Sequence, residues 1–499
     1  MEALANLLER RRGALGDYAL LPTSTHPSSP SDDKPPIAII RPRFTKRYMR
    51  TFATAVVSIT FICLLFGFDS QSEILQAYSS SEDPSFPPLY EQFHELERNL
   101  PQHSSAQPPR KYLYAANHVH ASGWGNALQE LILNAHLAHS SGRAFVFDNY
   151  TWDRDGPDYS EYNGHLIPSR IPLSAMISSP INGGPLPPDD NGPLSVSREY
   201  FNEVCPNRTI VSSNEVNDGM SSPSAGLVYE QWLEKLSAIE DPCVEVDRNS
   251  NQIFDIWIFG TKRILDIWPT LSKSPMLTQF NWSTLVLSAF EANKALFQSS
   301  QSVLYSLLPS FPIFSSPTNP HAPIPGLLAL HVRRGDFSGH CEHLAKWSST
   351  WNGFNAFPGL PDTFEVPAGG GWGENTPENR EYYMQHCFPT IEQIVEKVAS
   401  IRSTPEGKGL KRVYIMTNAP KDWIEEMKEA LRADGEWEGI ASSRDLKLNW
   451  EQRYVAQAVD MMVGQRAQVF VGNGFSSLTS NIIMLRTLHE FPLGANRLW

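Results

Sequence analysis

The sequence predicts an α/β protein with two domains of parallel strands and helices, preceded by a polar tail, a membrane segment and a stem. The first observation is length, because 499 residues exceed one ordinary domain. The second is alternation, since short apolar runs typical of strands buried on both faces are followed by helical patterns. The third is the proline-rich linker 309–325, which separates an N-terminal domain, 111–308, from a C-terminal domain, 326–499.

The overall charge and the missing motifs exclude several classes of function. The formal net charge of −13 argues against a nucleic-acid partner, because phosphate backbones select clustered lysine and arginine. The chain contains no Cys-x-x-Cys motif, which argues against a structural zinc site. It also lacks the G-x-x-x-x-G-K-[ST] loop, so phosphoryl transfer from ATP has no motif here.

The first 110 residues predict three segments. Residues 1–50 are polar and irregular, as expected of a disordered cytosolic tail. Residues 51–68 form an uncharged run that extends roughly 27 Å at ~1.5 Å per residue, just enough for a thin membrane. A buried core helix and a cleaved signal peptide are the alternatives, but the long tail before the run and the missing cleavage site argue against a signal peptide. Residues 69–110, rich in Ser, Pro and Glu, predict a stem.

The charges around the run predict its orientation. Basic residues precede it and acidic residues follow it, so the positive-inside rule predicts a single-pass type II protein whose remainder is lumenal. A short span fits the thin membranes of the endoplasmic reticulum or Golgi. In that compartment the acceptor triplets at Asn149, Asn207 and Asn281 predict N-glycosylation.

Four cysteines lie beyond the anchor, an even number in an oxidising compartment. We expect two disulfides, and among the three connectivities we favour nearest neighbours, Cys205 with Cys243 and Cys341 with Cys387. Four reduced, buried cysteines are the alternative.

The N-terminal domain opens with a predicted βαβ unit. Residues 112–116 and 143–147 predict strands, and 127–139 predict the helix between them. The turn before that helix contains Gly123 and Gly125, which permit a ligand to approach exposed helix amides, although a plain connecting turn explains them equally well. Residues 155–225 predict long loops, and amphipathic helical patterns return after 228, for example at 253–268.

The C-terminal domain repeats the alternation. Its strands are predicted at 327–330, 412–417 and 467–471, and its helices lie within 376–402, 423–431 and 450–463 and after Ser477. The first strand ends in His331, Arg333, Arg334 and Asp336, at the edge of a sheet where ligands bind in open α/β folds.

The polar residues at these strand ends suit a nucleotide diphosphate sugar. An arginine such as Arg333 grips phosphate with a planar fork, and Ser476 and Ser477 open a helix whose amides bind anions. Simple helix capping is the alternative role of the serines. The carboxylate of Asp460 matches the paired N–H donors of a guanine edge.

These residues resemble motifs of a known family. The stretch His331-Val-Arg333-Arg334-Gly-Asp336 resembles the His-x-Arg-x-x-Asp element of the GDP-fucose-dependent fucosyltransferases that include protein O-fucosyltransferases. Asp460 followed by Phe475-Ser476-Ser477 resembles their C-terminal element, and Gly123-Trp-Gly125-Asn126 is similar to their Gly-Phe-Gly-Asn turn. The resemblance covers residues 111–499, and the layout is most similar to fungal membrane-anchored members.

The resemblance implies a GT-B-like fold, two Rossmann-like domains facing a cleft, with the acceptor on the N-terminal side and the nucleotide sugar on the C-terminal side. It implies an inverting, metal-independent transfer of fucose from GDP-fucose to a hydroxyl of a protein or glycan, with no cofactor. By position, Arg333 contacts the β-phosphate, His331 and Asp460 the guanine, and Phe475, Ser476 and Ser477 the phosphates. The turn Gly123, Gly125 and Asn126 lies by the sugar or the acceptor, which makes Arg333 and Asn126 the catalytic candidates.

Two departures leave questions open. Trp124 stands in the first turn where family members often carry a smaller residue, which affects the acceptor contacts. No carboxylate near Asn126 is assigned as general base, and Glu130 is the nearest.

Two other functions compete with this prediction. A metal-dependent GT-A transferase would use Asp153 and Asp155 as ligands, although acids in a loop are usually only solvated. A non-catalytic, membrane-anchored protein that binds a nucleotide or a partner is the second alternative.

Overall fold

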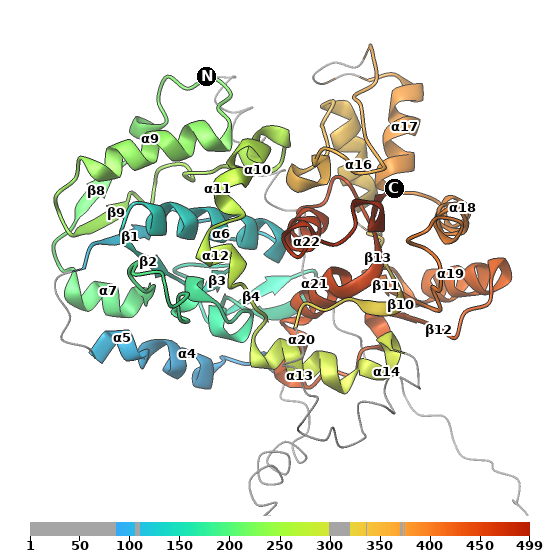
Figure 1. Ribbon diagram of the computed structural model, residues 1–499, viewed down its shortest axis with the longest axis horizontal. Coiled ribbons are helices and arrows are strands. Elements are labelled where there is room, and N and C mark those ends of the chain that lie inside the picture. Colours follow the sequence, from blue (N-terminus) through green and yellow to red (C-terminus); the bar gives the residue numbers. More distant parts are fainter. Residues whose placement is uncertain (1–85, 105–109, 299–319, 336, 370–372, 374) are drawn as a thin grey trace, which may run out of the picture. The chain divides into compact units, whose positions relative to one another are not determined.

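The computed structural model describes residues 86–104, 110–298, 320–335, 337–369, 373 and 375–499 (Figure 1). The predicted cytosolic tail, the predicted anchor 51–68 and most of the predicted linker lie outside these residues. Within them, no helix combines the length and the apolar character that crossing a membrane requires. Residues 87–499 fall in one compact unit.

The N-terminal half is built on a five-stranded parallel sheet. Its strands are β1 (Tyr112–Ala115), β2 (Ala144–Phe147), β7 (Val196–Ser197), β8 (Thr209–Val211) and β9 (Cys243–Val246), in the order β7-β2-β1-β9-β8. The chain fills one side from β1 through β2 to β7 and then returns on the other side of β1. The strand order therefore reverses between β1 and β9.

Helices and short strands complete this half. The helices are α6 (Trp124–Ser140), α7 (Arg198–Val204), α8 (Ser213–Val216), α9 (Ala225–Ser237), α10 (Ile256–Phe259), the 3-10 helix η3 (Lys262–Ile267), α11 (Trp268–Leu271) and α12 (Pro275–Thr278). Helix α6 is buried along most of its length and follows β1 as predicted, but it begins three residues earlier than expected. Gly125 and Asn126 therefore lie in its first turn rather than in the preceding loop.

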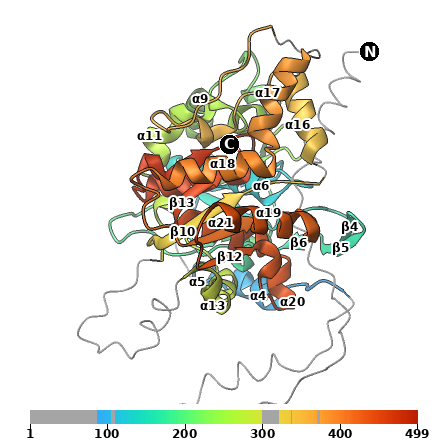
Figure 2. The same ribbon diagram turned by 90° about the vertical axis from the view of Figure 1, so that its right-hand side faces the viewer.

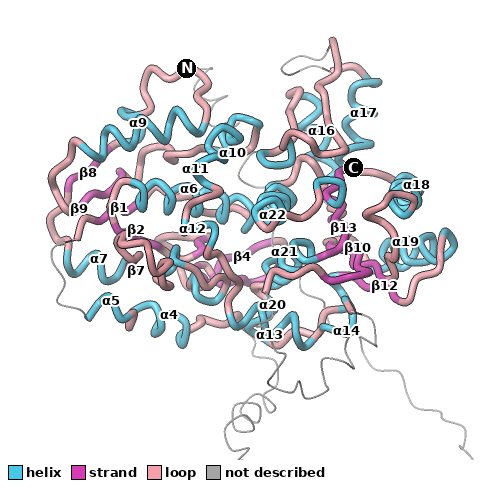
Figure 3. The backbone as a smooth tube through the Cα atoms, in the orientation of Figure 1, coloured by secondary structure: helices cyan, strands magenta, loops and turns pink. Residues whose placement is uncertain are grey.

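The region predicted as long loops contains small sheets. Strands β3 (Tyr150–Thr151) and β6 (Arg170–Ile171) pair with each other, and β4 (Tyr159–Tyr162) and β5 (His165–Pro168) form a hairpin. Loop still dominates between β2 and α7 (Figure 3).

The C-terminal half contains a second five-stranded parallel sheet. Its strands are β10 (Ile324–His331), β11 (Arg412–Met416), β12 (Gly439–Ser442), β13 (Ala467–Gly472) and β14 (Asn496–Leu498), in the order β12-β11-β10-β13-β14. The order reverses between β10 and β13. Strands β12 and β14 were not predicted, and β10 begins at Ile324, within the stretch predicted as linker.

Helices cover both faces of this second sheet. The helices of this half are α13 (Thr284–Ala292), α14 (Lys294–Phe297), α16 (Phe337–Lys346), α17 (Pro377–Cys387), α18 (Ile391–Arg402), α19 (Lys421–Asp434), α20 (Trp450–Arg453), α21 (Ala456–Arg466) and α22 (Ser477–Leu488). Helices α18 and α19, which face the viewer in Figure 2, pack on the face formed by Leu328, Leu330 and Val413. Helices α13 and α14 precede the predicted linker, yet they pack here: the Phe297 ring meets that of Tyr414 at 5.0 Å.

Two expectations are corrected. The single helix expected within 376–402 is two, because Phe388 and Pro389 interrupt it and a residue before proline avoids helical geometry. The segment predicted as a stem, 69–110, contains parts of the fold, since α4 (Glu91–Arg98) and α5 (Pro101–Ser104) lie within it. Glu97 is buried and accepts a hydrogen bond from the backbone N–H of Ser174 at 2.8 Å.

The two halves meet where α6 crosses α22, the helices that follow β1 and β13 (Figure 1). Asn481 donates from its side-chain amide to the carbonyl of Gly125 at 2.6 Å. Gln129 donates to the hydroxyl of Ser480, which also accepts from the backbone of Phe354. A methyl group at Gly125 would lie 2.6 Å from the backbone nitrogen of residue 478, so only glycine fits.

We therefore expect Gly125→Ala to lower the free energy of unfolding by about 1–3 kcal/mol, as overpacking a tight contact does. Gly339→Ala is the matched control, because Gly339 lies on α16 with no atom within 4 Å of an added Cβ. It should be neutral or raise stability by up to about 1 kcal/mol, as alanine is the better helix former. Urea unfolding of the two variants decides; equal stabilities would contradict the close contact.

Candidate active site at the carboxyl edge of the C-terminal sheet

The candidate site lies where β10 and β13 end side by side. In open α/β sheets this reversal point opens a crevice for ligands at the carboxyl ends of the strands. β10 ends at His331, and the chain continues into Arg333. β13 ends at Gly472 and leads through Phe475 and Ser476 into α22. The structure thus brings together the two motifs that the sequence singled out.

His331 is fixed by residues that sequence reasoning missed. Its Nδ1 lies 2.9 Å from the hydroxyl of Thr479 in the first turn of α22. The indole N–H of Trp499 donates to its carbonyl at 2.9 Å. A strand end in the sequence indicates where site residues gather. Only the packing of α22 and Trp499 on β10 shows that Thr479 and Trp499 are the residues that contact His331.

The two adjacent arginines have different environments. The Arg334 side chain is 4% exposed, and its guanidinium lies 4.3 Å from the ring centres of both Phe388 and Trp423. It donates to the carbonyl of Pro389, so it is held by rings and backbone. Burial lowers the pKa of Arg334 to about 10. Asp336, which follows two residues later, lies outside the described residues.

Arg333 points elsewhere and is only partly buried. Its guanidinium lies 5.4 Å from the ring centre of Phe337, and that ring contacts His340. His340 in turn lines a cleft that also contains Phe475. Arg333 is not one of the residues that line this cleft, and it is connected to the cleft through Phe337 and His340.

The turn from 472 to 477 is held rigidly. Asn473 donates from its side chain to the carbonyl of Cys387 at 2.7 Å and accepts from the backbone of Phe475 at 2.9 Å. The Phe475 ring packs on Phe364 and Tyr383. This fixes the amino end of α22 relative to β10.

The predicted serines of this turn are almost fully buried. Ser476 is the N-cap residue of α22, but its side chain makes no capping hydrogen bond. The hydroxyl of Ser477 lies against Gly125, 2.6 Å from the position of an added Cβ. Ser477 thus belongs to the contact between the halves, and phosphate binding by either serine stays a prediction.

Asp460 on α21 lies beneath the strand ends, 1% exposed. Its two oxygens accept hydrogen bonds from Tyr414 at 2.6 Å and Ser443 at 2.9 Å. Burial raises the pKa of its carboxyl to about 7, although these bonds favour the charged form. Each oxygen thus already accepts one hydrogen bond within the fold, and the contact with guanine stays a prediction.

The first turn of α6 places Asn126 against the loop before the helix. Its side-chain amide donates to the hydroxyl of Ser122 at 3.1 Å. One turn later, Glu130 is 1% exposed and accepts the backbone N–H of Val119 at 2.5 Å. Burial raises the pKa of Glu130 to about 7. In this arrangement Glu130 holds the 116–123 loop and is not open to an acceptor.

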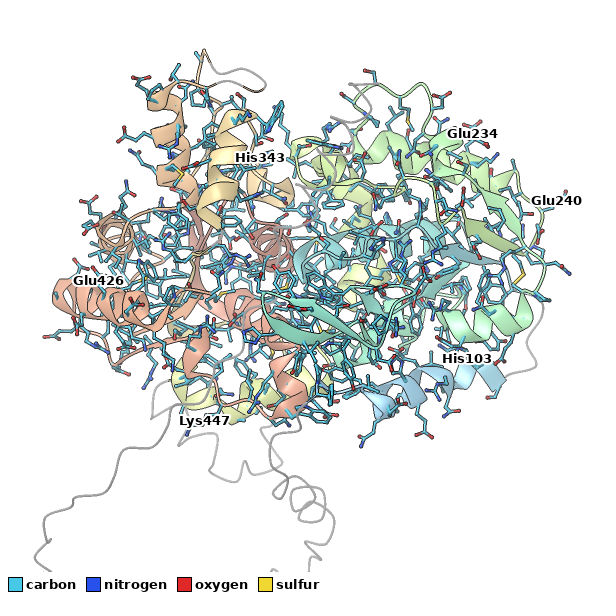
Figure 4. All side chains as sticks on the ribbon, turned by 180° about the vertical axis from the view of Figure 1, so that it is seen from behind. His103, Glu234, Glu240, His343, Glu426 and Lys447 are labelled. Atoms are coloured by element: carbon cyan, nitrogen blue, oxygen red, sulfur yellow. A yellow bond between two sulfur atoms is a disulfide. The ribbon has the colours of Figure 1, made fainter. Side chains whose placement is uncertain are left out.

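A cleft of about 280 Å³ lies beside the 472–477 turn and is lined by both halves. Trp257 at its rim is 49% exposed and comes from α10. His343, which Figure 4 labels, comes from α16, and Trp347 directly follows that helix. Aromatic rings of this kind offer flat surfaces on which a sugar ring can stack.

The acids of the metal-dependent alternative serve local roles. Asp153 accepts from the backbone of Asp155 and Gly156 and so closes a turn. Asp155 pairs with Arg248. The geometry therefore gives no support to a metal site formed by these two carboxylates.

The remaining predicted site residues are the cysteines and the glycosylation positions. Disulfides join Cys205 to Cys243 and Cys341 to Cys387, the nearest-neighbour pairs. Asn207 is exposed and Asn281 is partly buried. Asn149 is buried and its side-chain amide donates to Asp148, and glycosylation at the three positions stays a prediction.

Comparison with known proteins agrees with the motifs. Residues 278–489 match the family model described as GDP-fucose protein O-fucosyltransferase. This match includes β10 and the turn after β13. The matched segment places the C-terminal part of the chain, residues 278–489, with the GDP-fucose protein O-fucosyltransferase family. The chain is thus an enzyme of a glycosyltransferase family that uses GDP-fucose.

Solved structures show weaker similarity. A crystal structure of POFUT1 in complex with GDP-fucose is 16% identical, with a TM-score of 0.45, and the match covers 77% of this chain and 95% of that chain. A crystal structure of POFUT1 in complex with GDP is 16% identical, with a TM-score of 0.44, covering 76% and 95%. No curated protein matches the chain significantly.

The environment of His331 predicts a pH dependence of stability. Burial, reinforced by Arg333, lowers its pKa from 6.5 to about 3. Below pH 6.5 the unfolded chain therefore binds a proton that the folded chain does not, and stability present above pH 6.5 is lost progressively down to pH 3. By pH 5 the loss from this group is about 2 kcal/mol.

We expect urea unfolding at pH 7 and pH 5 to show a larger drop for the native chain than for His331→Gln, by about 2 kcal/mol. Groups other than His331 contribute equally to both chains and cancel in the difference. Identical drops would mean that His331 titrates alike in the folded and unfolded chain.

Proposed function

We propose that this enzyme transfers fucose from GDP-fucose to a hydroxyl of a protein or glycan acceptor, with inversion and without a metal ion. The observation that carries the proposal is the position of Arg333 at the reversal point of the C-terminal sheet, two residues after His331, which contacts Thr479 in the first turn of α22. An arginine and helix amides at such a point suit a diphosphate. The family match supplies the donor.

In the proposed reaction the acceptor oxygen attacks the anomeric carbon from the face opposite the nucleotide. The bond from that carbon to the β-phosphate oxygen breaks, and negative charge grows on the leaving GDP. Arg333 stabilises this charge, and preorganised donors of this kind accelerate reactions by roughly 10²–10³-fold. The acceptor proton leaves with solvent or a base. The aromatic cleft lined by Trp257 and Trp347 is the space beside the donor in which sugar and acceptor meet.

The proposed reaction also assigns a role to each half of the chain. The N-terminal half presents the acceptor and the C-terminal half the donor, in the manner of a GT-B fold. We also propose a type II anchor at 51–68 and a lumenal location in the endoplasmic reticulum or Golgi. The two disulfides suit an oxidising compartment.

Substitution of the adjacent arginines tests the donor site. Arg333→Ala should abolish measurable GDP-fucose binding and lower transfer by about 10²–10³-fold, while the unfolding midpoint stays near that of the native chain. Arg334→Ala, the matched control, should cost roughly 2–4 kcal/mol of stability because it empties the space between two aromatic rings. At a temperature where this variant is folded, it should still bind the donor.

Calorimetry with GDP-fucose and thermal unfolding of both variants separate the two roles. Unchanged donor affinity in Arg333→Ala would remove Arg333 from the site. Donor binding without transfer to any acceptor would favour the non-catalytic alternative.

The metal-independent mechanism has its own test. Treatment with EDTA should leave the rate of fucose transfer unchanged, because Asp153 and Asp155 bond to the backbone and to Arg248. Added Mn²⁺ should not raise that rate. If EDTA abolished transfer and Mn²⁺ restored it, the metal-dependent alternative would replace the proposal.

A further inference from the structure

A second cavity lies in the N-terminal half and is lined mainly by charged side chains. Its volume is about 290 Å³. Five arginines line it together with three carboxylates, an excess of positive charge; the arginines are Arg154, Arg170, Arg198, Arg208 and Arg248. None of them belongs to the donor site described above.

The cavity lies at the reversal point of the N-terminal sheet. Ala116, Asp148, Arg198 and Arg248 line it, and each lies within two residues of the carboxyl end of β1, β2, β7 or β9. β1 and β9 are the neighbours between which the strand order reverses. The cavity therefore occupies, in this sheet, the position at which open α/β sheets bind ligands.

The carboxylates of the cavity are already engaged. Asp148 accepts from Tyr114 at 2.9 Å and Arg198 at 3.0 Å and lies 3.3 Å from a ring nitrogen of His118. Burial alone would raise its pKa, but His118 and Arg198 hold the pKa of Asp148 well below its usual range. Arg208 and Arg248 bond the other two carboxylates, and the first of these pairs is 2.6 Å long. All three carboxylates of the cavity are thus paired with arginines, so they are not available to bind a cation.

These pairs leave two arginines of the cavity, of which Arg170 pairs with Asp158 outside the lining and Arg154 carries the remaining charge. It forms no ion pair among the described residues, and its guanidinium donates to the carbonyl of His118. Burial, reinforced by Arg248, lowers the pKa of Arg154. A cation that is partly buried, bonded to a neutral carbonyl and close to another cation favours an anion beside it.

The chemistry of the lining favours a carboxylate on a peptide over a sugar ring. Sugars stack on aromatic faces, which are plentiful in the cleft beside Phe475. Here the only phenol or imidazole rings among the lining residues, Tyr114 and His118, are both engaged by Asp148. The planar forks of several arginines instead match carboxylate oxygens two at a time.

One loop joins this cavity to the donor side. His118 lines the cavity, Glu130 holds the next backbone N–H, and Ser122 bonds Asn126 in the first turn of α6. The neighbouring residue, Gly125, contacts α22 directly. A ligand held in the cavity is thus connected through residues 116–126 to the helix that opens at the candidate donor site.

We propose that this cavity binds an acidic side chain, aspartate or glutamate, of a polypeptide acceptor and so selects hydroxyls that lie near a carboxylate. The inference rests on the proposed fucose transfer and adds the acceptor class.

The test uses the purified full chain and two fluorescent peptide mixtures. Both mixtures carry a central threonine; one has Asp and Glu at flanking positions, and the other has Asn and Gln. Fluorescence anisotropy should show tighter binding of the acidic mixture, weakened by added salt because the interaction is between charges. Incorporation of labelled fucose should follow the same preference.

Arg154→Gln should weaken binding of the acidic mixture by about tenfold or more and leave the neutral mixture unchanged, as expected for the loss of a hydrogen bond to a charged group. Arg154→Lys should be intermediate, because it keeps the charge and loses the fork. Arg98→Ala, at an exposed arginine on α4, is the control and should bind like the native chain. If Arg154→Gln does not fold, Arg248→Gln replaces it, since that arginine bonds only an exposed carboxylate of the cavity.

The outcomes separate this inference from the proposed function. Equal binding of the two mixtures, with GDP-fucose still bound in calorimetry, overturns the acceptor assignment alone. Failure of the native chain to bind GDP-fucose overturns the proposed function whatever the peptides do. If an oligosaccharide of glucuronate displaces the acidic mixture at lower concentration than free aspartate does, the cavity is a glycan site and the peptide assignment is wrong.

Discussion

The contact between the first turns of α6 and α22 determines how the rest of the molecule is arranged. Each helix leaves a strand at the point where its own sheet reverses strand order, β1 in one half and β13 in the other. Gly125 allows the two helices to approach until a methyl group no longer fits. The reversal points of the two sheets are therefore held in a fixed relation, which a reaction between two bound molecules requires.

The polar groups in this contact set its geometry as well as its strength. Gln129 donates to Ser480, Asn481 donates to a backbone carbonyl, and Ser480 also accepts from Phe354. Apolar packing alone would tolerate a sliding of the two helices, because it has no preferred direction. Buried donors and acceptors lose free energy if the helices shift and leave them without partners. Directional bonds in a buried contact thus fix its register.

Local sequence patterns predicted most of the strands and helices, whereas packing between distant segments determined what surrounds each side chain. Some elements could be predicted because burial produces a local apolar pattern and turns require particular residues. These elements are the strand at 327–330, the turn before α22 and the first βαβ unit. The proline that splits α17 from α18 was visible too, although its effect was not recognised. Strands β12 and β14 carry no apolar alternation, and they become strands only because a neighbouring strand pairs with them.

The side-chain roles were harder to predict for the same reason. For Arg334, the groups that hold its guanidinium are two rings, Phe388 and Trp423, which come from segments distant from it in the sequence. Asp460 was expected to contact guanine, and the structure adds that Tyr414 and Ser443 each donate to one of its oxygens. Local spacing shows that a charged group stands at a strand end, yet the groups that neutralise it come from elsewhere in the chain.

Net charge and local charge are informative at different scales. The chain carries a formal charge of −13, which argues against nucleic acid as a partner. Both reversal points are nevertheless positive, one through Arg333 and the other through the cluster around Arg154. In the proposed reaction each point holds an anion, a diphosphate on one side and a carboxylate on the other. Two anions brought close in a poorly screened site repel each other unless fixed cations stand beside each. A helix contact that keeps two separate arginine sites in place meets that requirement within an acidic protein.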